Sequence, residues 1–116
     1  MVTYNFPTQV RGDSFGPINF TITVNASPLD LTGALIRADF RVQGYRYLRL
    51  STNPGAEDGT ITITDATAGK FSIIQQIIDI PKHEYDYDIE ILLASGVRKT
   101  YIGGTWTVQE DITHDR

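Results

Sequence analysis

The chain has 116 residues and a formal net charge of −4, and it contains no cysteine. This length suits a single domain that buries its own hydrophobic core. The absence of cysteine excludes disulfides, thiolate metal sites and a cysteine nucleophile. The negative charge argues against a nucleic-acid partner, because such partners are held mainly by Lys and Arg on their phosphates. We therefore expect one domain over residues 1–116 that binds no nucleic acid.

The composition favours strands over helices. Isoleucine, threonine, valine and the aromatic residues together make up 46 of the 116 residues, and these are the residue types enriched in β-strands. No stretch approaches the roughly 18 consecutive apolar residues of a membrane span, and the first residues lack the basic and apolar segments of a signal peptide. We expect a soluble all-β protein that is made in the cytoplasm and does not bind membranes.

Two strands are predicted in the first half of the chain by apolar residues at every second position. In Pro17–Val24 the apolar residues alternate with Asn and Thr, and a turn follows at Asn25–Pro28. In Ala34–Val42 they alternate with an outer face of Arg37, Asp39 and Arg41. Between these strands, Asp30 is expected to bind backbone N–H groups of its own turn, and Gly33 to take a positive φ.

The middle of the chain predicts shorter elements. Tyr45–Leu50 is a strand, Ser51–Gly59 is a loop, and Thr60–Thr64 forms a hairpin with Phe71–Ile73 through the Ala68–Gly69 turn. Gln75–Lys82 is ambiguous, since its isoleucines have helical spacing, but Pro81 limits it to a helical turn or two.

The last third predicts a strand from Tyr85 to Leu92 and two more at Val97–Ile102 and Thr105–Val108, separated by a bulge or bend at Gly103–Gly104. About seven short strands separated by turns favour an immunoglobulin-like antiparallel β-sandwich over a barrel. We expect Tyr85 or Tyr87 to bind a loop through its hydroxyl. The predicted core contains Phe20, Ile22, Ile36, Phe40, Ile89, Ile91, Trp106 and Val108.

The sequence offers little for catalysis or metal binding. Asp86, Asp88 and Glu90 share one strand face, where they could contribute to a calcium site but are better explained as a solvated face that pairs with Arg37 or Arg41. His83 and His114 lack zinc-site spacing, and no serine-nucleophile motif is present. We expect no enzyme activity, no catalytic or metal-binding residues and no cofactor.

A partner-binding surface is predicted at two places. Tyrosine and arginine are enriched at binding hot spots, which favours the face formed by Tyr45, Arg46, Tyr47 and Arg49. Gly44 could form a bulge that directs this face outward. The alternative is an ordinary strand whose tyrosines cover the edge of the core. The uncharged run with Thr60, Thr62 and Thr64 is the second candidate, because an unprotected strand edge can pair with another chain.

Several short motifs follow one another along the chain: Gly12–Phe15, Asp30–Gly33 before a strand with Arg37 and Arg41, Tyr87–Glu90, Gly96–Val97, Gly104–Val108 and Asp111–Thr113. In this order they resemble small immunoglobulin-like domains of tailed bacteriophages and prophages. The chain is similar over most of its length to the N-terminal domain of the phage baseplate upper protein. Trp106 departs from the pattern, where Phe or another apolar residue is more frequent.

This resemblance implies a structural protein of the virion tail or baseplate that docks on other tail proteins or on copies of itself. The chain has no long C-terminal extension of the kind found in a full receptor-binding assembly, so a small tail accessory protein is expected. The alternative function is a carbohydrate-binding or adhesin-type module that binds a glycan through Tyr45, Tyr47 and nearby loops. Fold alone does not separate these functions.

Overall fold

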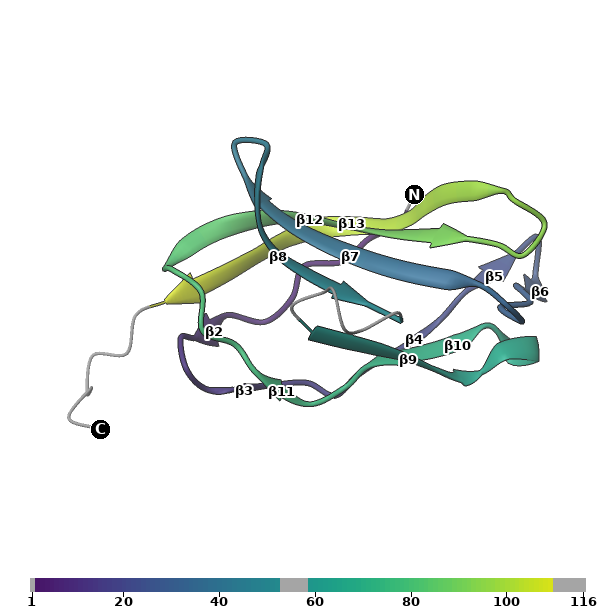
Figure 1. Cartoon of the computed structure of the whole chain (residues 1–116), viewed down its shortest axis with the longest axis horizontal. Helices are drawn as coiled ribbons and strands as arrows, with labels where there is room; N and C mark the ends of the chain where they lie inside the picture. Colours follow the sequence, from purple (N-terminus) through teal and green to yellow (C-terminus); the bar gives the residue numbers. More distant parts are fainter. Residues whose placement is uncertain (1, 53–58, 110–116) are drawn as a thin grey trace.

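The structure is a computed structural model that describes residues 2–52 and 59–109 (Figure 1). Apart from the single 3₁₀ turn η1 (Ala66–Ala68), its regular structure is all β, as predicted. Seven strands have four or more residues, in agreement with the predicted number. They are β4 (Ile18–Thr21), β7 (Leu35–Val42), β8 (Tyr45–Ser51), β9 (Gly59–Asp65), β10 (Lys70–Ile73), β12 (His83–Leu92) and β13 (Arg98–Gln109).

The strands form a sandwich of two layers (Figure 1). One layer has the order β13-β12-β7-β8 and the other β9-β10-β4. A short parallel pairing of Leu50 and Ser51 on β8 with Gly59 and Thr60 on β9 joins the layers. The two-residue strands β1 (Val2–Thr3) and β2 (Gln9–Val10) also lie parallel to β13. The sequence predicted an antiparallel sandwich. The structure adds these short parallel pairings to it.

The predicted first strand is divided in two. β4 ends at Thr21, and β5 (Thr23–Val24) turns away to pair with β6 (Ser27–Pro28). The break is at Ile22. Its N–H donates to the Gly69 carbonyl at 2.9 Å, and its carbonyl accepts from the Leu29 N–H at 3.0 Å. Val24 is consequently exposed, whereas period-two alternation placed it on the buried face.

Two other segments also differ from the prediction. Gln75–Lys82 contains no helical turn; instead β11 (Gln76–Ile77) pairs with β3 (Ser14–Phe15). The two predicted C-terminal strands form one continuous strand, β13, which does not break at Gly103–Gly104. The bulge lies two residues before Gly103, because Ile102 pairs with Ile89 and Thr100 with Glu90, which leaves Tyr101 without a direct partner on β12.

Gly104 has a different function, which is to admit the N-terminal segment beside β13. A Cβ atom at this position would lie 2.2 Å from the Tyr4 carbonyl oxygen. The Tyr4 N–H donates to the Gly103 carbonyl at 2.9 Å, and the Phe6 N–H donates to the Thr105 carbonyl at 3.1 Å. The hydroxyl of Tyr87 donates to the Tyr4 carbonyl, so it fixes the same segment.

The turn predicted at Asp30–Gly33 and the loop contact predicted for a tyrosine hydroxyl are both present. The Asp30 carboxylate accepts hydrogen bonds from the Thr32 hydroxyl at 2.6 Å and the Thr32 N–H at 2.9 Å, and these bonds lower its pKa. Gly33 has φ of +71°. The Tyr85 hydroxyl donates to the Pro81 carbonyl four residues earlier, and burial raises the Tyr85 pKa to about 12.

Aromatic side chains fill the space between the two layers. Trp106 is fully buried, with its ring centroid 4.7 Å from that of Phe15 and 4.9 Å from that of Phe40. Phe6 reaches this cluster from the N-terminal segment and stacks on Tyr87 at 4.5 Å. Seven of the eight predicted core residues are buried; the exception, Phe20, lies on the outermost strand and is only partly buried.

Replacement of Trp106 tests this core. We expect Trp106→Ala to lower the free energy of unfolding by about 3–5 kcal/mol, the range for truncation of a buried large aromatic side chain. Trp106→Phe should cost less, because it keeps most of the ring volume and removes an indole N–H that has no hydrogen-bond partner among the described residues. Urea denaturation followed by circular dichroism measures both, and near-native stability of Trp106→Ala would contradict the assignment.

Candidate functional site

The predicted tyrosine and arginine surface lies at the tip of the β7–β8 hairpin, which projects from the body of the sandwich (Figure 1). Gln43 and Gly44 form the turn, with φ of +51° and +82°. The bulge expected at Gly44 lies instead at Tyr47. Leu48 pairs with Phe40 and Arg46 with Arg41, so Tyr47 has no direct partner on β7.

Tyr47 connects the exposed tip to the core. Its ring centroid lies 5.0 Å from that of Tyr45, 5.7 Å from the exposed His83 and 5.7 Å from the buried Tyr85. Tyr45 is 68% exposed and Tyr47 is 36% exposed. We call Tyr45, Arg46, Tyr47 and His83 the tip surface. Packing on Tyr85 limits the motion of Tyr47, and a rigid aromatic side chain loses little entropy when it binds a partner.

The same part of β8 has an open backbone edge. Tyr45, Arg46 and Leu48 pair with β7, whereas the parallel contact of β8 with β9 is confined to Leu50 and Ser51. Within the described ranges, no second strand pairs with Tyr45–Leu48. The tip surface thus combines exposed aromatic rings, an exposed guanidinium and unpaired peptide groups, all of which are features of partner-binding surfaces.

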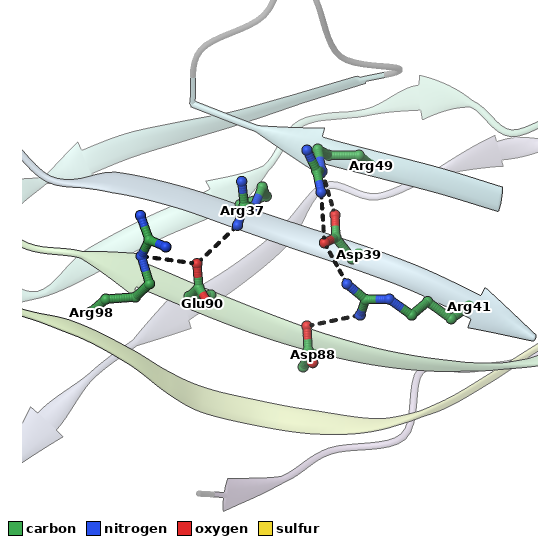
Figure 2. A network of polar contacts seen from close by, with 7 residues as sticks. All are labelled: Arg37, Asp39, Arg41, Arg49, Asp88, Glu90 and Arg98. Atoms are coloured by element: carbon green, nitrogen blue, oxygen red, sulfur yellow. Dashed lines mark hydrogen bonds and ion pairs between the residues drawn. The ribbon is translucent and has the colours of Figure 1, made fainter. Parts of the chain in front are cut away.

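Arg49 is separate from the tip surface, because it binds the carboxylate of Asp39 (Figure 2). Its Nε lies 2.6 Å from Asp39 Oδ1 and its Nη2 lies 3.0 Å from Oδ2. Arg41 donates to Oδ2 of the same carboxylate at 2.9 Å. The Asp39 side chain is only 5% exposed. Asp39 lies on the predicted outer face but is buried there, since the side chains of Arg41 and Arg49 cover it.

The arginines around Asp39 change the pKa of its carboxyl group. Burial raises its pKa, but the hydrogen bonds from Arg49 and the charges of Arg49, Arg41 and Arg37 outweigh burial and lower it below the ordinary value. The folded state therefore favours the ionised carboxylate. This contribution to stability is complete above the pKa of an unfolded Asp and is lost as the pH falls through the lowered value.

Two of the three acidic residues predicted to pair with Arg37 or Arg41, namely Asp88 and Glu90, do so. Glu90 accepts from Arg37 at 3.0 Å and lies 3.6 Å from Arg98, and Asp88 lies 3.6 Å from Arg41 (Figure 2). Among residues 2–52 and 59–109, no group of three His, Asp or Glu side chains is arranged to hold a metal ion. An open pocket of about 160 Å³ lies beside Arg37, Glu90 and Arg98.

The threonine run lies on the other layer, on β9. Thr60 pairs with Ser51 of β8, and its N–H also donates to the side-chain oxygen of Gln76 at 3.3 Å. Thr62 pairs with Ser72, and Thr64 is a bulge residue between Ile63 and Asp65. Their side chains are not brought together with Tyr45 and Arg46. β9 lies between β8 and β10 in the strand order, but its pairing with β8 is confined to Gly59 and Thr60.

Two features of the site were missed from the sequence. The bulge at Tyr47 depends on a register shift between β7 and β8, which no local motif marks. His83 lies outside the strand predicted from Tyr85 to Leu92, but it begins β12 and extends the aromatic cluster. Its position two residues before Tyr85 in an alternating strand is the signal that could have placed it.

Comparison of the chain with models of protein families gives no match, and searches of curated proteins and solved structures give no significant match. In the part of the chain that the structure describes, no helix has the length and apolar character to cross a membrane.

Replacement of Asp39 tests the arginine network. We expect Asp39→Asn to lower the free energy of unfolding at pH 7 by about 2 kcal/mol, because hydrogen bonds to charged groups are lost from a buried position. The difference from wild type should shrink as the pH falls from the ordinary Asp range through the lowered pKa of Asp39, since proton binding then favours the unfolded wild-type chain. Denaturant titrations across this pH range measure the effect.

Asp88→Asn is the matched control, because Asp88 contacts Arg41 at 3.6 Å from a more exposed position. Exposed pairs of this kind contribute about 0–1 kcal/mol. Equal losses in the two variants, or a loss in Asp39→Asn that does not change with pH, would contradict the central role of Asp39.

Proposed function

We propose that this protein is a non-enzymatic docking module of a bacteriophage or prophage tail or baseplate, and that it binds other tail proteins or copies of itself. The observation that carries the proposal is the tip surface, where Tyr45 is 68% exposed and lies beside Arg46 and Tyr47. These residues extend from a rigid sandwich on a projecting hairpin with an open edge. Such a geometry suits insertion of an aromatic anchor into a pocket of a partner protein.

The phage context is supported by the ordered motifs from Gly12 to Thr113, although Asp111–Thr113 lie outside the described residues. The strand order is consistent with an immunoglobulin-like sandwich, in which one sheet has the order G-F-C-C′ and the other D-E-B. β13-β12-β7-β8 and β9-β10-β4 follow this order. On this proposal the protein is made in the bacterial cytoplasm and is then located in the virion tail.

A carbohydrate-binding or adhesin-type module is the second candidate, and the exposed ring of Tyr45 is the observation that favours it. Aromatic rings can stack on sugar faces, and flat platforms of several rings suit this contact best. The Tyr45 and Tyr47 rings lie at 66° to one another, so they form no common plane. This geometry favours a protein partner, whose pocket can accept one projecting ring.

The proposal is tested by incorporation into phage particles. Phages that lack the gene are complemented with wild type or with Tyr45→Ala/Tyr47→Ala, and the protein in purified virions is quantified by mass spectrometry. We expect wild type at a fixed copy number and at least about a tenfold loss for the double variant, the effect of removing about 1.4 kcal/mol of binding energy.

Ile77→Ala is the control, because Ile77 is 64% exposed and lies on β11, away from the hairpin. It should be incorporated as wild type. Absence of the wild-type protein from purified virions would refute the tail proposal. If that result were joined by glycan binding that Tyr45→Ala abolishes, the carbohydrate-binding function would replace it.

A further inference from the structure

β4 is the open edge of the smaller layer. It stands last in the strand order and, within residues 2–52 and 59–109, pairs only with β10. The Ile22 N–H donates to Gly69 on the β10 side. Peptide groups alternate in direction along a strand, so the N–H and C=O groups of Ile18 and Phe20 also point to β10. The N–H and C=O groups of Asn19 and Thr21 therefore point away from the sheet.

This edge lacks the protection that edge strands usually have. No charged residue occurs from Ser14 to Leu29, between Asp13 and Asp30. Edge strands in monomeric proteins are commonly blocked by Lys, inward-pointing charges or proline. Pro17 precedes β4, so it blocks pairing only before the strand begins. An uncharged edge with alternating apolar residues is suited to pair with another strand.

A groove of about 310 Å³ lies along this edge. β4 and Ile22 line it on one side, and Val2, Tyr4 and Ile102 line it on the other. Ile18 and Phe20 are only partly buried, and Tyr4 is 41% exposed while its ring packs edge-on to Phe20 at 6.2 Å. Apolar surface is thus available beside unpaired backbone groups, and a strand placed along β4 would cover both.

We propose that β4 pairs with β4 of a second copy of this chain, antiparallel and centred on Phe20. This inference rests on the proposed docking function and assigns it a second surface and a defined partner. In this register Asn19 lies opposite Thr21 of the second copy, and Thr21 lies opposite its Asn19. These are the residues whose N–H and C=O groups point outward, so both pairs exchange backbone hydrogen bonds.

The side chains match in the same register. Phe20 lies opposite Phe20 of the second copy, and Ile18 lies opposite Ile22, so apolar residues meet on the groove side. Asn19 and Thr21 are exposed and meet on the other side. Registers centred on Asn19 or Thr21 give fewer matches. The register centred on Asn19, for example, places Thr21 opposite Pro17, which has no N–H to donate. A two-fold axis makes one surface complementary to itself, which is the commonest arrangement of homodimers.

The register is tested by charge substitution on the exposed face of β4. Sedimentation velocity over a concentration series should show a dimer for wild type. In Asn19→Lys/Thr21→Lys, each lysine faces a lysine of the second copy, so we expect the dissociation constant to rise about tenfold. In Asn19→Lys/Thr21→Glu, each lysine faces a glutamate, and dimerisation should return to within a few-fold of wild type.

Ser95→Lys/Val97→Lys is the matched control, because it places the same charges two residues apart on exposed positions of the turn between β12 and β13. It should dimerise as wild type, and circular dichroism checks that all variants are folded. A wild-type chain that stays monomeric at high concentration refutes the inference, as does a dimer that Asn19→Lys/Thr21→Lys leaves intact. Either result leaves virion incorporation through the tip surface unaffected, so the two proposals fail separately.

Discussion

The fold depends on a single aromatic cluster that both layers and the N-terminal segment share. Trp106 and Tyr87 come from neighbouring strands of one layer, Phe15 from the short strand β3, and Phe6 from the chain start. Because large rings bury much apolar area and pack in restricted geometries, this cluster fixes how the layers face each other. Among residues 2–52 and 59–109, strand pairing between the layers is confined to that of β8 with β9, so side-chain packing holds the layers together.

The sequence predicted those parts of the fold in which one face of a strand is buried along its whole length. β7 and β12 have strict alternation because they pair on both sides and cover the core. Alternation was misleading near Val24, where the chain leaves the sheet to form a local hairpin. The isoleucine-rich segment after Ile73 suggested helical spacing, but pairing with β3, about 60 residues earlier, determined its structure.

The candidate surfaces were predictable in composition and not in arrangement. Tyr45 and Arg46 are exposed because they lie beside a tight turn. Arg49 is separate from them because it binds Asp39, a buried carboxylate that needs cationic partners. The open edge at β4 could not be recognised without the strand order. The sequence of β4 is that of an ordinary half-buried strand, and only the topology shows that no described strand lies beyond it.

The path of the N-terminal segment also has a consequence for how the chain acquires this structure. Asn5 accepts a hydrogen bond from the Thr105 N–H, 100 residues away in sequence, and Phe6 enters the core beside it. The first residues can reach their places only after the last strand has been synthesised. Contacts between such distant residues raise the contact order and slow folding. A nascent chain on the ribosome therefore carries an incomplete core until β13 emerges.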